Sequence, residues 1–153
     1  MRLAENSSEI IESFFREYLN DEDFELPKIN FFAGKLASVI STFLRIQGIT
    51  IGKSILISPN SIILENNKKT TSKTLIVHEI AHVLQYRREG FFRFLYKYFR
   101  SYLGNFRKKR DWSPISRLEA YLEIPFEIEA RKVADDFVKW QKHSDYWCSK
   151  VSK

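Results

Sequence analysis

The sequence contains few of the residues on which several classes of small protein depend. Its one cysteine, Cys148, excludes an internal disulfide framework and a zinc module built from several cysteines. Five glycines and four prolines in 153 residues leave little chain for flexible linkers. No uninterrupted apolar run approaches the roughly 18 to 20 residues of a transmembrane helix, and the first residues lack the apolar stretch of a signal peptide. We therefore expect one domain over residues 1–153, soluble and cytoplasmic.

Acidic residues are scarce in one part of the chain. The whole sequence has 25 Lys and Arg against 19 Asp and Glu, a formal net charge of +6. Residues 87–110 hold nine of the basic residues and only one acidic residue, Glu89, so this segment carries +8 and the other 129 residues carry −2. An overall basic coat for nucleic acid is excluded, and we expect no nucleic-acid partner. The basic stripe is local and needs its own explanation.

Apolar and aromatic residues are abundant, at 44% and 15%, which is enough for a core. Their spacing and the flanking caps predict helices at Ser7 to Leu19, Phe32 to Ile46, Ser72 to about Gly90, Phe91 to Leu103, a segment opening at Ser113, and Pro125 to about Trp140. Short β-branched runs predict two or three strands at Ile49 to Ile51, Ser54 to Ile57 and Ser61 to Leu64. Residues 66–69 form a polar break. This order of elements predicts an α+β fold, mainly helical, with a small sheet beside the third helix.

The third predicted helix carries the motif H-E-x-x-H, as His78, Glu79 and His82. Histidines four residues apart lie on one face of a helix, so both imidazoles can reach one zinc ion (Zn2+). Glu79 lies beside the first histidine, where its carboxylate can act as general base toward a zinc-activated water. The flanks are apolar nearly all round the helix, and a buried histidine needs a partner. The structural alternative is two satisfied core histidines with a surface glutamate.

A catalytic zinc ion needs a third protein ligand, and no further histidine follows at short spacing. In the last predicted helix Glu127 shares the apolar face of Ala130 and Ala134, whereas Glu129 belongs to the outer face. A carboxylate on an apolar face is costly unless it is paired or bound to metal. Glu127 is therefore the predicted ligand. Other carboxylates remain as alternatives: Glu129, Glu119 and Glu123.

These residues resemble the gluzincin side of the zincin metallopeptidases. H-E-I-A-H-V-L-Q at residues 78–85, followed by E-I-E-A-R-K-V-A at residues 127–134, is similar to families whose H-E-x-x-H helix is completed by a glutamate on a later helix. A particular likeness is to the small bacterial metallopeptidase domains related to the core domain of contractile injection systems. The resemblance covers residues 49–138. It implies a zincin-like fold, a single zinc ion and hydrolysis of peptide bonds.

The sequence departs from that family at the residue four after the ligand glutamate. Many gluzincins place an aspartate there to orient the first histidine, and this chain has Arg131. We expect the orienting group elsewhere, at Asp135 or Asp136. An oxyanion in the transition state also needs a donor besides the metal, and Tyr121 and His143 are the candidates.

Residues 91–106 interleave eight aromatic residues with Arg93, Lys97 and Arg100. Phe92, Leu95, Phe99 and Leu103 form the stripe opposite these basic residues, and we expect it to pack over the zinc helix, because a chain of this size needs core. The basic stripe is then a solvated face that binds an anionic membrane or an acidic partner weakly and releases it at high salt. Residues 107–110 are expected to form a basic loop.

The sequence as a whole predicts a zinc metallopeptidase that acts on a peptide or protein substrate. An extended substrate would pair with a strand edge beside the zinc helix, at Ser54 to Ile57 or Ser61 to Glu65. The alternative function is a non-catalytic module, stabilised by zinc, that recruits an acidic partner or an anionic membrane through the basic and aromatic helix.

Overall fold

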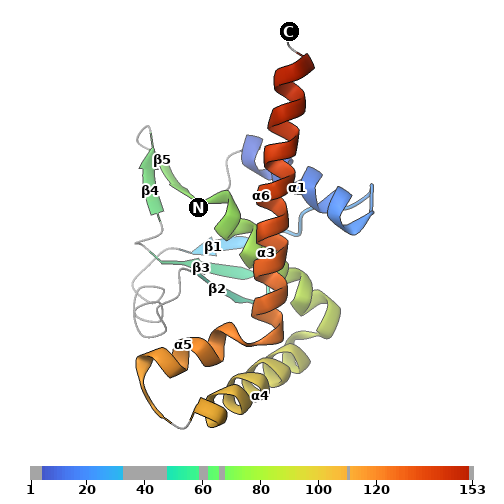
Figure 1. The fold of residues 1–153 in the computed structure, drawn as a ribbon. Helices are drawn as coiled ribbons and strands as arrows, with labels where there is room; N and C mark the ends of the chain where they lie inside the picture. The colour runs from blue at the N-terminus through green and yellow to red at the C-terminus, as the bar shows by residue number, and fades with distance from the viewer. Residues whose placement is uncertain (1–4, 33–47, 59–61, 66–67, 110, 152–153) are drawn as a thin grey trace.

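The computed structural model describes residues 5–32, 48–58, 62–65, 68–109 and 111–151 (Figure 1). The helices are α1 (Glu5–Leu19), α3 (Lys73–Glu89), α4 (Phe91–Lys109), α5 (Pro114–Leu122) and α6 (Pro125–Val151). The strands are β1 (Asn30–Phe32), β2 (Gly48–Ile51), β3 (Ser54–Ile57), β4 (Ile62–Glu65) and β5 (Lys68–Thr71). The fold is therefore α+β and mainly helical over these residues.

Three strands form a small sheet in the order β1-β3-β2, with β1 parallel and β2 antiparallel to β3. The β2–β3 hairpin turns at Gly52, whose φ of 62° lies in the left-handed region that favours glycine. Strand β2 contacts α3, and among the described residues it is an edge of the sheet. Strands β4 and β5 form a separate antiparallel pair.

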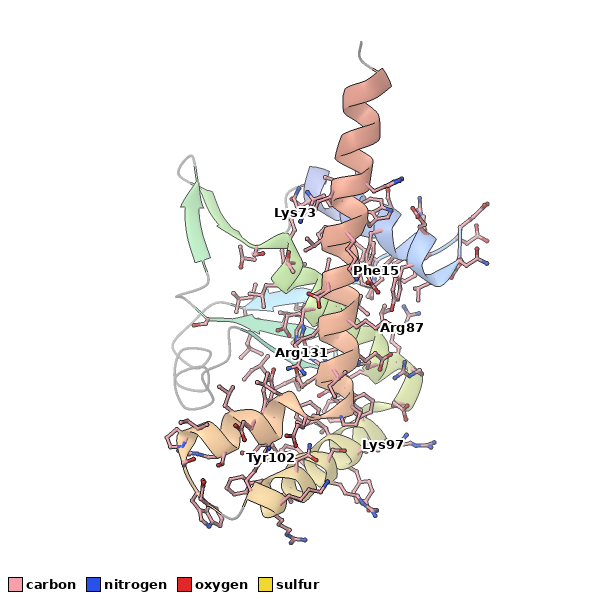
Figure 2. All side chains as sticks on the ribbon, viewed as in Figure 1. Phe15, Lys73, Arg87, Lys97, Tyr102 and Arg131 are labelled. Atoms are coloured by element: carbon pink, nitrogen blue, oxygen red, sulfur yellow. The ribbon has the colours of Figure 1, made fainter. Side chains whose placement is uncertain are left out.

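Helices α3 and α6 make the most extensive helix contact in the described part of the chain, and they form the centre of the molecule (Figure 1). Val77 and Ile80 of α3 and Phe137 of α6 are fully buried there. Helix α1 adds Phe15, which Figure 2 shows where α1 meets α6. A second cluster joins α3, α4 and the start of α6: Tyr86, Phe94, Ile124 and Phe126.

Two helices are longer than their sequence signals indicate. Helix α4 runs through Gly104, the predicted end, to Lys109, so residues 107–109 are helical rather than a loop. A side chain at Gly104 would meet nothing within 4 Å, so this glycine marks no turn or close packing. Helix α6 continues beyond the predicted end at Trp140 to Val151. For α4, contacts with α5, among them the bond from the Asn105 amide to the Ala120 carbonyl, override the weak local signal.

The strands also correct the sequence prediction. Two residues of the predicted polar break, Lys68 and Lys69, belong to β5, because Lys68–Thr71 pairs with Ile62–Glu65. Strand β3, proposed as a substrate edge, lies in the middle of its sheet. The predicted helix at residues 32–46 lies outside the described residues, except for Phe32, which belongs to β1.

The aromatic residues of α4 do not all pack into the core. Phe94 is buried, but Phe92 is 82% exposed, Phe99 58% and Leu103 50%. Helix α4 lies at one end of the molecule, so only its inner side meets other elements (Figure 1). The expectation that the stripe of Phe92, Leu95, Phe99 and Leu103 packs over the α3 helix is therefore wrong for Phe92, Phe99 and Leu103. Leu95 is half-buried and packs against the second cluster. None of the helices seen in the described residues has the length and apolarity to cross a membrane.

The α1–α6 contact gives a direct test of this core. Phe137→Ala removes a fully buried ring that packs edge-on against Phe14 at 5.2 Å between centroids. We expect urea denaturation to show a loss of about 3 to 5 kcal/mol in the free energy of unfolding. The matched control Phe99→Ala removes an exposed ring and should change it by less than about 0.5 kcal/mol. Equal losses for both variants would contradict the assigned packing.

Candidate metal centre

Helix α3 places His78 and His82 one turn apart, facing α6. The helix begins after Ser72 and ends at Gly90, whose N–H bonds to the carbonyl of Tyr86. It is apolar on most sides because it is covered by the β1-β3-β2 sheet on one side and by α6 on another. The polar side chains of the H-E-x-x-H motif are therefore buried or nearly so, and their partners must come from neighbouring elements.

Glu127 comes from the first turn of α6 and lies between the two histidines. The Nε2 atoms of His78 and His82 are 3.2 Å apart. Each lies 3.3 Å from one carboxylate oxygen of Glu127, Oε2 for His78 and Oε1 for His82. A tetrahedral ion with bonds of about 2.0 to 2.1 Å separates its ligand atoms by about 3.3 to 3.4 Å. The donor atoms therefore have the spacing of a metal site, and this group could hold a metal ion.

The charged groups of this cluster shift one another's pKa values. Burial acts to raise the pKa of Glu127, but hydrogen bonds with His78 and His82 outweigh burial and hold that pKa well below its usual range. Burial alone would lower the pKa of His82. The neighbouring Glu127 carboxylate outweighs burial and raises that pKa to about 9. In the absence of a metal ion the negative charge of Glu127 is thus balanced by the positive charge of protonated His82.

Gln85 orients the second histidine. Its amide nitrogen donates to the carbonyl of Phe126 at 3.0 Å and to Oε2 of Glu129 at 3.1 Å. Its amide oxygen therefore faces His82, at 2.8 Å from Nδ1. An amide oxygen only accepts, so Nδ1 of His82 carries a proton, and a metal ion would take the place of the second proton, on Nε2.

Glu79 is held by the edge strand β2. Only 3% of the residue is exposed, and the hydroxyl of Thr50 donates to its Oε2 at 2.6 Å. Gly48 lies so close that a Cβ at that position would be 2.5 Å from Oε1 of Glu79. Burial is the main cause that raises the pKa of the Glu79 carboxyl, while the Thr50 hydrogen bond and the two histidines act to lower it. Strand β2 therefore fixes the carboxylate through one hydrogen bond and one close approach.

Two tyrosine hydroxyls donate to the carboxylate of Glu127. Tyr98 of α4 donates to Oε1 and Tyr121 of α5 to Oε2, each at 2.7 Å. Burial, with the charge of Glu127, raises the pKa of both hydroxyls, so both keep their protons and act as donors. Tyr121, predicted as an oxyanion donor, lies in the cluster, but in this arrangement its proton is directed to Glu127.

Tyr98 is one of the residues of this cluster that the sequence did not indicate. In the sequence it is one of eight aromatic residues in a helical segment, and nothing in that segment distinguishes it. Only the packing of α4 against α6 brings its hydroxyl to Glu127. A tyrosine on the same side as the buried Phe94, four residues earlier, is the one signal that could have indicated an inward position.

The structure does not bring His143 to this cluster. It is exposed and follows Glu127 by sixteen residues on the same helix, which is about 24 Å along the axis. The alternative carboxylates form ion pairs instead. Glu129 pairs with Arg88 at 2.7 Å, and Glu119 and Glu123 pair with Lys109 at 3.1 and 2.6 Å.

The expected orienting aspartates also lie apart from the histidines. Asp135 is exposed, and Asp136 pairs with Lys139 at 2.9 Å. Arg131, at the position where the family often has aspartate, donates to the carbonyl of Leu122 at the end of α5 (Figure 2). It satisfies a helix terminus there, which is a structural role.

Comparisons of this chain with protein families, with curated proteins and with solved structures find no match. Any conclusion about function therefore rests on the geometry of the cluster itself.

Removal of Glu127 tests the cluster as a metal site. We expect Glu127→Ala to weaken Zn2+ binding by more than about 100-fold, since even partners outside the ligand set contribute about 10- to 100-fold. The matched control is Glu129→Ala, two residues along the same helix, which leaves Gln85 its bond to the Phe126 carbonyl. Competition with a chromogenic chelator measures both affinities. If both variants bind Zn2+ equally, Glu127 is not a ligand.

Tyr98→Phe tests the support of the ligand from α4. Loss of one donor to Glu127 should lower Zn2+ affinity by about tenfold, because the carboxylate is less firmly held. Tyr96→Phe is the control, since that hydroxyl is on the same helix and accepts from Arg100 at 3.0 Å, away from the site. Isothermal titration of both variants gives the comparison. Unchanged affinity for Tyr98→Phe would mean that its hydrogen bond does not support the ligand.

Proposed function

We propose that the protein is a zinc-dependent metallopeptidase of zincin-like architecture. The observation that carries this proposal is the spacing of His78, His82 and Glu127, at 3.2 to 3.3 Å between donor atoms, with Glu79 buried in the same cluster. Two imidazoles and one carboxylate are a donor set that suits zinc. Three protein ligands leave the fourth position of a tetrahedron for water or substrate, as in catalytic rather than structural zinc sites.

Glu79 is the proposed general base. When bound, a zinc ion lowers the pKa of a water molecule and polarises the carbonyl of the scissile peptide bond. The Glu79 carboxylate accepts the proton of the attacking water and returns it to the leaving amine. Thr50 and Gly48 hold the carboxylate in one orientation.

Strand β2 is the proposed platform for substrate. It is an edge strand among the described residues, and its Thr50 contacts the general base directly. An extended peptide that pairs with this edge would lie beside Glu79 and the two histidines. This arrangement, with an edge strand along the motif helix and a glutamate from a later helix, supports the resemblance to the gluzincins.

Glu79→Gln separates catalysis from metal binding. The amide keeps the size of the side chain but cannot take a proton, so we expect one zinc ion per chain, a native fold, and a loss of about 100-fold or more in kcat/KM. Metal content by elemental analysis and cleavage of an unfolded protein substrate measure the two effects. Glu89→Gln is the control on the same helix, where Glu89 pairs with Lys97. A Glu79→Gln variant that loses zinc, or one that keeps full activity, would show that the assigned role is wrong.

A further inference from the structure

The outer side of α4 carries a continuous apolar stripe. Its members are all at least half exposed: Phe92 82%, Tyr96 62%, Phe99 58% and Leu103 50%. Their spacing of four, three and four residues places them on one face of the helix, and eleven residues span about 16 Å along its axis. These four residues are called the outer stripe below. Monomeric proteins rarely leave such a row of large apolar side chains in water without a purpose.

The inner side of the same helix is held in place, so rotation cannot bury the outer stripe. Phe94 packs on Phe126 with 4.5 Å between ring centroids. Tyr98 bonds to Glu127 at 2.7 Å. Tyr102, labelled in Figure 2, packs against the second cluster, which contains Phe94 and Phe126. The phase of α4 is therefore fixed by packing and by the candidate metal centre.

Another aromatic side chain is exposed beyond the end of α4. Trp112 is 83% exposed, and its ring meets Phe106 edge-on at 4.9 Å between centroids. Exposed tryptophan and tyrosine are typical of surfaces at the boundary between lipid and water, because each has an apolar body and a polar group.

The charges of α4 are of one sign only. The helix contains six basic residues and no acidic residue. Lys97 and Lys109 are neutralised by glutamates at 2.6 Å each, so Lys97 does not belong to a free basic stripe as the sequence predicted. Of the other four, Arg93 also pairs with Glu89, at 3.6 Å, and Arg100, Arg107 and Lys108 form no ion pair among the described residues. Arg100 and Arg107, seven residues and therefore about two turns apart, lie along one flank of the outer stripe.

We propose that α4 is an interfacial helix that docks on an anionic lipid surface. The outer stripe inserts at the level of the lipid headgroups, and the arginine flank pairs with their phosphates. Helix α4 lies at the end of the molecule opposite the C-terminus, where a flat surface can reach it (Figure 1). A second copy of the chain fits this face less well, because two α4 helices would bring together only positive charges.

The experiment is co-sedimentation of the full chain with vesicles of phosphatidylcholine alone, or with about 30% phosphatidylserine. We expect binding to the anionic vesicles that weakens but persists when salt is raised from about 0.15 M to about 0.5 M, because apolar insertion is not screened. Phe92→Ser with Phe99→Ser should weaken binding about tenfold or more at both salt concentrations. The control Leu19→Ser, at a site 43% exposed on α1, should bind as the unmodified chain does.

A second pair of variants tests the charge. Arg100→Ser with Arg107→Ser should weaken binding roughly thirtyfold at low salt and much less at high salt. Lys132→Ser with Lys142→Ser removes two exposed charges from α6 and is the matched control. On binding, the emission of Trp112 should shift to shorter wavelength, and Trp112→Phe should remove that shift.

Three results would overturn the proposal. The first is no binding to anionic vesicles at about 0.15 M salt. The second is equal binding by the Phe92→Ser/Phe99→Ser and Leu19→Ser variants, which would mean adsorption by charge alone. The third is a chain that ignores vesicles but either dimerises through the outer stripe or binds polyglutamate, which would assign this face to a second copy or to an acidic protein.

Discussion

The buried carboxylate of Glu127 is the constraint on which the arrangement of the helices depends. A carboxylate inside the contact between α3 and α6 is costly unless every oxygen is paired. Here two imidazoles come from α3, and two tyrosine hydroxyls come from α4 and α5. Four helices therefore meet at one side chain. Removal of the charge or of its partners affects the packing of all four, and a metal ion would replace the proton of His82 as the balancing charge.

Helix α4 connects two different surfaces of the molecule. Tyr98 on its inner side donates to the Glu127 carboxylate, while Phe99, the next residue, is 58% exposed on its outer side. Successive side chains of a helix point in directions about 100° apart, so adjacent aromatic residues can lie on different sides and make different contacts. The aromatic residues of this helix therefore fall into three groups: those packed in the core, Tyr98, which bonds to Glu127, and those of the outer stripe.

The edge strand β2 shows how a small sheet can serve a polar site. Gly48 leaves room for the Glu79 carboxylate, and the Thr50 hydroxyl holds it. Neither residue forms part of a recognisable motif, because a glycine and a threonine in a short strand are common. Their role depends on the placement of β2 along α3, which involves residues about 30 positions apart in the chain.

The sequence by itself determined the α+β class, most helix starts, and the three residues His78, His82 and Glu127 that come together. It could do so because these features follow from local periodicity, from Pro and Ser at helix starts, and from the phase of Glu127 relative to Ala130 and Ala134. Only the tertiary structure decided that Tyr98 reaches the cluster, that Gln85 orients His82, and that His143 lies apart. Those outcomes depend on how one helix is rotated and placed against another, and such contacts between distant segments leave no periodic signal in the chain.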